Sequence, residues 1–98
     1  MDTRQEEFAL LRGEVLRAAL READAAGGPS CWLRLRSVAE ALGADFSGEA
    51  GPVLWQHYAE MAGHYRETGD LSGLEAIEGG EVVFRLTDRG IAEARAEG

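Results

Sequence analysis

Disulfides and membrane segments are the first features that this sequence lacks. Cys31 is the single cysteine, so no disulfide can form within the chain. No apolar run approaches the roughly 20 residues that a helix needs to cross a bilayer, and the first seven residues are polar and acidic, unlike a signal peptide. We therefore expect a protein of the reducing cytoplasm with no membrane partner.

Positive charge is also scarce. The chain has no lysine, and its ten basic residues face eighteen acidic ones, which gives a formal net charge of −8. Because a phosphate backbone attracts cationic surfaces, nucleic-acid-binding domains normally carry a basic footprint. The overall charge therefore disfavours a nucleic-acid partner unless the arginines gather on one face.

The remaining composition is that of one globular domain of 98 residues, with 45% hydrophobic and 29% charged residues. Apolar residues at helical spacing predict a first helix from Arg4 to Ala26. Thr3 and Glu6 have the spacing of a capping box at its start, and the Gly-Gly-Pro-Ser run of residues 27–30 ends it.

Three shorter elements are expected next. The alternation of apolar and polar residues over 31–35 predicts a strand, and Ser37 is placed to cap a short second helix that ends at Gly43. A third helix is expected from Pro52 to Thr68, with Gly69 as its stop. Four residues at helical spacing are predicted to face the core from this helix: Leu54, Tyr58, Met61 and Tyr65.

A β-hairpin is predicted after the third helix. Residues 74–77 and 82–86 are rich in strand formers, and the two glycines between them, Gly79 and Gly80, accept the positive φ angles of a tight turn. Ile77 is expected to pair with Val82 across this turn. Since there are too few helices for a bundle and too few strands for a separate sheet, the elements must share one core. The sequence predicts an α+β domain with the order helix-strand-helix-helix-β-hairpin-helix.

The end of the hairpin carries a family resemblance. Thr87 is placed to cap a last helix that runs to Ala96, and residues 84–90 read Phe-Arg-Leu-Thr-Asp-Arg-Gly. This stretch resembles the "aromatic-x-LT-x-x-G" segment of MarR- and PadR-type regulators, and the order of elements resembles the winged-helix fold. The resemblance implies a dimeric transcription regulator that dimerises through its first and last helices. Its third helix (52–68) would enter the DNA major groove, and its wing (74–86) would touch the flanking backbone.

The residues that would contact DNA depart from that family. Gln56 could read a base, but recognition requires phosphate contacts that come mainly from Arg and Lys. The outer face of the third helix instead offers Gln56, Ala59, Glu60, Gly63 and Glu67, with Arg66 at its margin; the wing is acidic, and the MarR-type Asp-x-Arg signature is missing. We therefore predict a non-enzymatic module that forms a homodimer or docks on a protein with a basic surface. The predicted partner-binding residues are Gln56, Glu60, Glu67, Glu75, Glu78 and Glu81.

Two alternatives stay open. One is a DNA-binding transcriptional regulator, which would use a basic strip of Arg34, Arg36, Arg66 and Arg85 together with Gln56. The other is an acidic inhibitor that mimics DNA in the groove of a basic protein, for which an anionic surface speeds association. The arginines of the first helix are expected to form a solvated, partly paired face: Arg4, Arg12, Arg17 and Arg21.

Catalytic and metal-binding arrangements are not evident. His57 and His64 lie two turns apart, about 10 Å along a helix, which is too far for both to bind one ion together with Cys31. The two histidines are expected to be half-buried beside the core, and Trp32 and Trp55 are expected to pack inside it. We predict no metal, no cofactor and no enzymatic activity.

Overall fold

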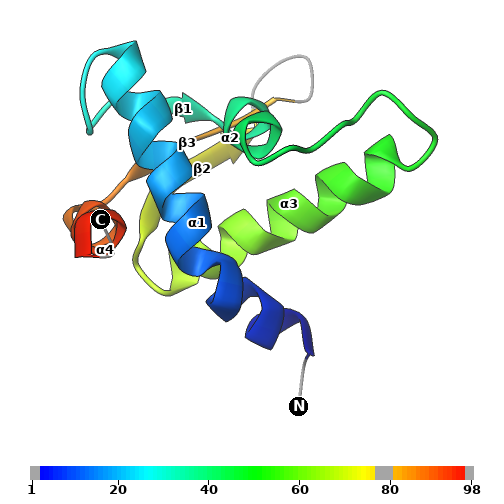
Figure 1. Ribbon diagram of the computed structural model, residues 1–98, viewed down its shortest axis with the longest axis horizontal. Coiled ribbons are helices and arrows are strands. Elements are labelled where there is room, and N and C mark those ends of the chain that lie inside the picture. Colours follow the sequence, from blue (N-terminus) through cyan, green and yellow to red (C-terminus); the bar gives the residue numbers. More distant parts are fainter. Residues whose placement is uncertain (1–2, 77–80, 97–98) are drawn as a thin grey trace.

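The chain folds into four helices and a three-stranded antiparallel sheet within residues 3–76 and 81–96, the ranges that the computed structural model describes (Figure 1). The elements are α1 (Thr3–Ala26), β1 (Leu33–Arg34), α2 (Leu35–Ala41), α3 (Gly51–Glu67), β2 (Leu71–Ala76), β3 (Val82–Leu86) and α4 (Asp88–Ala96). The predicted α+β class and the predicted order of elements are confirmed. None of these described helices is long and apolar enough to span a membrane.

The sheet has the order β1-β3-β2, so the central strand β3 is antiparallel to both neighbours. Val82 pairs with Ala76, and the predicted pairing of Val82 with Ile77 is therefore wrong; Ile77 itself lies outside the described residues. Strand β2 starts three residues earlier than predicted, and the pair of Leu71 and Leu86 at that end is buried. Burial at this end fixes the register, because a slip would turn these leucines out of the core.

The inner face of the sheet and the helices enclose one core. Leu33 and Phe84, which are partners across β1 and β3, are both buried. Leu16 of α1, Val38 of α2 and Tyr65 of α3 belong to the same cluster and are at most 1% exposed. Side chains on alternate positions of β1 and β3 therefore point away from the helices.

Strand β1 is shorter than the alternation over residues 31–35 predicts. Helix α2 already begins at Leu35, with Arg34 in the N-cap position, so the predicted cap Ser37 lies inside the helix. Three residues at positions i, i+3 and i+4 of α2 are buried: Leu35, Val38 and Ala39. Burial at helical spacing decides the structure here, which the short alternation could not reveal.

Helix α3 begins one residue before the predicted Pro52. Its N-terminal half extends away from the sheet beside the loop that leaves α2 (Figure 1). The four residues predicted to face the core divide accordingly: Met61 and Tyr65 are buried, whereas Leu54 and Tyr58 are half-buried. The outward half of α3 is therefore the more accessible part of the helix.

Helix α4 is held by the cap that the sequence predicts. The Thr87 hydroxyl accepts a hydrogen bond from the backbone N–H of Gly90 at 3.1 Å and donates one to the carbonyl of Gly69. Gly69 has a φ of 89° and ends α3 as predicted. Helix α4 also packs against α1 (Figure 1). The sides of α1 and α4 that face each other are thus covered within one chain.

Candidate functional site

The exposed side of α3 carries the first part of the predicted partner-binding site. Gln56 and Glu67 are exposed, and Glu60 is half-buried. Gln56 and Glu60 line a depression of about 180 Å³ together with Val53 and His57. Val53 is 73% exposed, which places a bare apolar group beside an amide and a carboxylate. We call these five residues the α3 surface.

The five residues of the α3 surface include no arginine or lysine. The sequence has no arginine or lysine between Arg36 and Arg66, and Arg66 lies exposed in the last turn of α3. On this helix, phosphate contacts would fall to Arg66 alone.

Among its described residues, the hairpin contributes one exposed acid to the predicted site. Glu75 on β2 is exposed, whereas Glu78 lies outside the described residues. Glu81 has an internal partner, because its carboxylate accepts a hydrogen bond from Nε of Arg36 at 3.0 Å. Its side chain is only 22% exposed. Glu81 therefore forms an ion pair that links the hairpin to α2, rather than presenting its charge to a partner protein.

Arg36 contacts two aromatic rings as well as Glu81. Its guanidinium carbon lies 5.2 Å from the ring centre of Phe46 and 5.0 Å from that of Trp55. The two rings meet edge to face at 5.4 Å, and Trp55 packs against the core as predicted. These cation–π contacts join α2, the following loop and α3. Arg36 thus has a different environment from Arg34 and Arg85.

Two arginines of the basic strip share the outer face of the sheet with Trp32. Arg34 pairs with Val83 across β1 and β3, and Arg85 lies two residues further along β3. The side chains of Arg34, Val83 and Arg85 therefore point to the same side of the sheet. Trp32 is 49% exposed, and its predicted place in the core is therefore wrong. Because Leu33 faces the core, the residue before it must face outward. We call Trp32, Arg34, Val83 and Arg85 the outer sheet face.

The two histidines of α3 flank one phenylalanine of α1. The ring centre of Phe8 lies 5.5 Å from that of His57 and 5.6 Å from that of His64, and both histidines are half-buried as predicted. His57 Nε2 also lies 3.7 Å from a carboxylate oxygen of Glu7. In the described ranges 3–76 and 81–96, no group of three His, Cys, Asp or Glu residues could hold a metal ion. The histidines dock the start of α1 on α3.

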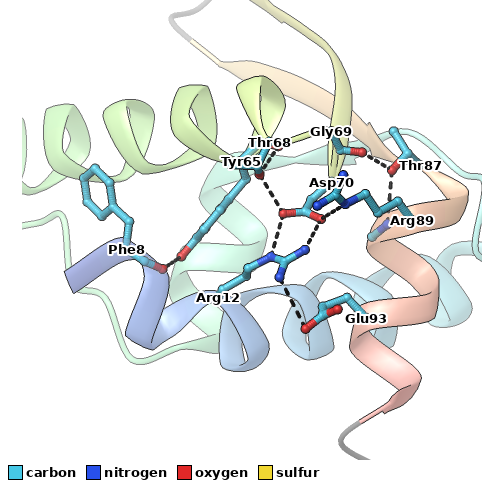
Figure 2. Close-up of polar contacts among 10 residues, drawn as sticks. Phe8, Arg12, Tyr65, Thr68, Gly69, Asp70, Thr87, Arg89 and Glu93 are labelled. Atoms are coloured by element: carbon cyan, nitrogen blue, oxygen red, sulfur yellow. Dashed lines mark hydrogen bonds and ion pairs between the residues drawn. The ribbon is translucent and has the colours of Figure 1, made fainter. Parts of the chain in front are cut away.

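A buried carboxylate that sequence reasoning missed lies where α3 leads into β2. Asp70 is 0% exposed, and it accepts hydrogen bonds from Nε and Nη2 of Arg12 at 2.8 and 2.7 Å and from Oγ1 of Thr68 at 2.8 Å (Figure 2). Nε of Arg89 lies 3.9 Å away, and Nη1 of Arg12 lies 3.3 Å from Glu93. Arg12 was predicted to lie on a solvated, partly paired face; it is paired, but with a buried carboxylate, and its own side chain is only 26% exposed. One carboxylate at the junction of α3 and β2 thus contacts arginines of both α1 and α4.

The charge state of Asp70 follows from these contacts. Burial by itself would raise the pKa of Asp70, but the hydrogen bonds from Arg12 and Thr68 and the charges of Arg12 and Arg89 outweigh burial and hold this pKa below its usual value. Nearby, burial raises the pKa of Tyr65, whose hydroxyl donates a hydrogen bond to the carbonyl of Phe8 (Figure 2). The Asp70 carboxylate and the Tyr65 hydroxyl thus both form hydrogen bonds to residues of α1. An acid after a helix-ending glycine gives no sign of such burial in the sequence.

Comparison with known proteins gives no family for this chain, so its function has to be inferred from its surfaces. The chain matched no protein-family model, no curated protein and no solved structure. Of the predicted partner-binding residues, the structure brings Gln56 and Glu60 into one depression. Of the basic strip, it brings together Arg34 and Arg85 on one sheet face and gives Arg36 a different environment.

Proposed function

We propose that this chain is a winged-helix-like domain that acts by binding another protein through the α3 surface. The observation that carries the proposal is the depression on α3, where the exposed side chain of Val53 adjoins the polar groups of Gln56 and Glu60. Protein interfaces combine an apolar centre with a polar rim. The partner that fits presents an apolar side chain beside a cationic one.

The charge of this region supports a basic partner. Glu60 and Glu67 lie on α3, and the overall charge is −8. Opposite charge on a partner speeds association and makes it sensitive to salt. The winged-helix assignment is supported by the order of elements, by the packing of α3 on β2 and by the Thr87 cap. An inhibitor that mimics DNA is one form of this proposal, and a homodimer through α1 and α4 is compatible with it.

A DNA-binding regulator is the second candidate function. The observation that favours it is the shared position of Arg34 and Arg85 on the outer sheet face. A recognition helix, however, is positioned on DNA by phosphate contacts, and α3 offers Arg66 only in its last turn. The protein-binding function therefore takes precedence.

The Val53→Asp variant is expected to lose the partner that the wild-type chain retains. A charge in the depression removes the apolar contact and leaves an unpaired carboxylate at the interface. We expect retention of that partner to fall at least about tenfold, which corresponds to about 1.4 kcal/mol. The measurement is quantitative mass spectrometry of proteins captured by the tagged chain.

Leu10→Asp is the matched control for this experiment. Leu10 is 84% exposed on α1, so the same charge replaces another highly exposed apolar group elsewhere. A partner that is captured to the same extent by wild type, Val53→Asp and Leu10→Asp would exclude the α3 surface as the docking site.

Duplex DNA of random sequence is expected to bind the wild-type chain more weakly than about 100 µM even at about 50 mM salt. The double variant Glu67→Arg/Glu75→Arg is expected to gain salt-sensitive DNA binding, because both positions are exposed. Its change at Glu67 is also expected to weaken binding of the protein partner at the α3 surface. Fluorescence anisotropy of a labelled duplex measures the DNA binding. Micromolar binding by the wild type that weakens steeply with salt would favour the regulator instead.

A further inference from the structure

The outer sheet face differs in chemistry from the α3 surface. It presents an indole ring and two guanidinium groups in a chain whose net charge is −8. The helices pack on the opposite face of the sheet through Leu33, Phe84 and Leu86. A ligand on the outer sheet face would thus be separated from the core by the sheet itself.

The indole of Trp32 is held in place by the backbone beneath it. The ring reaches β2, where a Cβ atom on Gly73 would lie 2.6 Å from Cη2 and Cζ3 of the indole. Gly73 has a φ of 89° and lies in the irregularity between Ser72 and Glu75. This glycine both permits the local backbone and leaves room for the ring. Trp32 is thus a pre-positioned exposed aromatic group.

The two arginines beside the ring have no acidic partner within the described ranges. Arg12 and Arg36 each form ion pairs, whereas no described carboxylate lies within ion-pair distance of Arg34 or Arg85. The Arg85 guanidinium carbon lies 4.9 Å from the Trp32 ring centre, and a stacked guanidinium keeps its N–H donors free at its edge. Among the described residues, Glu75 shares this face, because it pairs in the sheet with Val83. Together with Arg34 and Arg85 it gives these described residues a net charge of +1.

We propose that the outer sheet face binds an acidic peptide segment of a partner protein. A carboxylate of the segment accepts hydrogen bonds from Arg34 or Arg85, and an adjacent apolar side chain packs on Trp32. Charge complementarity argues for this occupant, and Trp and Arg are the residue types that contribute most binding energy at interfaces. Two cations on a chain of charge −8 suit single carboxylates better than a continuous polyanion. The proposal does not depend on the α3 surface.

The test uses a labelled synthetic peptide in which glutamate alternates with leucine, and the same peptide with glutamine in place of glutamate. Fluorescence anisotropy with the full chain is expected to show binding of the glutamate peptide and at least about tenfold weaker binding of the glutamine peptide. Trp32→Ser and Arg85→Gln are each expected to weaken binding of the glutamate peptide by a similar factor. Arg21→Gln removes an exposed arginine of α1 and is expected to leave binding unchanged.

Gly73→Ala provides a variant that changes no charge. The new methyl group displaces the indole, so binding of the glutamate peptide is expected to weaken while thermal unfolding verifies that the variant is folded. No binding by the wild type, or equal losses in Arg85→Gln and Arg21→Gln, would overturn the proposal. Tighter binding of single-stranded oligothymidylate than of the peptide, lost in Trp32→Ser, would overturn it in favour of nucleic acid.

Discussion

Replacing Arg12 by methionine is expected to lower the free energy of unfolding by about 3–5 kcal/mol. The side chain of Asp70 is fully buried, and Arg12 supplies two of its hydrogen bonds and its nearest positive charge. Methionine keeps the length of the side chain but leaves a buried carboxylate whose remaining counter-charge is the largely exposed Arg89, 3.9 Å away. Urea denaturation followed by circular dichroism measures the loss.

Arg89→Met is the matched control, because it removes the same functional group at 3.9 Å from the same carboxylate. The Arg89 side chain is 68% exposed, so its loss is expected to cost less than about 1 kcal/mol. The double variant Arg12→Met/Asp70→Asn is expected to be more stable than Arg12→Met, since it removes the buried charge that has lost its two hydrogen bonds from Arg12. Equal losses in Arg12→Met and Arg89→Met would refute a dominant role for the Arg12–Asp70 pair.

The same pair predicts how stability depends on pH. The folded-state pKa of Asp70 lies below the usual value of about 3.9. A carboxyl with a lowered pKa stabilises the fold above its unfolded pKa, and this contribution is lost as the pH falls through the folded pKa. The stability difference between wild type and Asp70→Asn is thus expected to be constant above about pH 5 and to shrink below about pH 4. A difference that grows on acidification would contradict the assignment.

Gly90→Ala is the second substitution with a large expected effect. A Cβ atom on Gly90 would overlap the backbone carbonyl of Asp70, so α4 would have to move away from the α3–β2 junction. A backbone atom cannot turn aside as a side chain can, and we expect a loss of about 3 kcal/mol. The gain in helix propensity of about 1 kcal/mol offsets only part of the overlap.

Gly63→Ala is the control for Gly90→Ala. Gly63 also lies in a helix, but a Cβ atom there would meet nothing within 4 Å. The substitution is expected to stabilise the chain by up to about 1 kcal/mol through helix propensity. Thermal unfolding measures the stability of both variants relative to the wild type. Destabilisation of both to the same extent would disprove the predicted overlap.

The parts of the fold that sequence reasoning predicted depend on local backbone chemistry. Gly69 ends α3 because it accepts a positive φ, and Thr87 caps α4 through its own hydroxyl. The order of elements follows from such signals together with helical periodicity. The hairpin register was missed because burial of Leu71 and Leu86, at the end far from the glycines, decides it.

The surfaces could be predicted only in part, because they depend on contacts between distant residues. Arg12 and Asp70 are 58 positions apart, and Arg36 and Glu81 are 45 positions apart. In each pair, side chains that the sequence places on helix or hairpin surfaces form an ion pair within the chain. Trp32 was misplaced for the same reason, since its partner Gly73 lies on another strand. Gln56 and Glu67, by contrast, are exposed where helical spacing put them.

The two tryptophans give this chain a built-in optical readout. Trp32 lies under Arg85 on the sheet, while Trp55 lies under Arg36 between α2 and α3. Each indole thus has its own guanidinium neighbour and its own degree of contact with water. Emission spectra of single-tryptophan variants would report separately on the two regions, so that ligands arriving at different sites could be distinguished without a label.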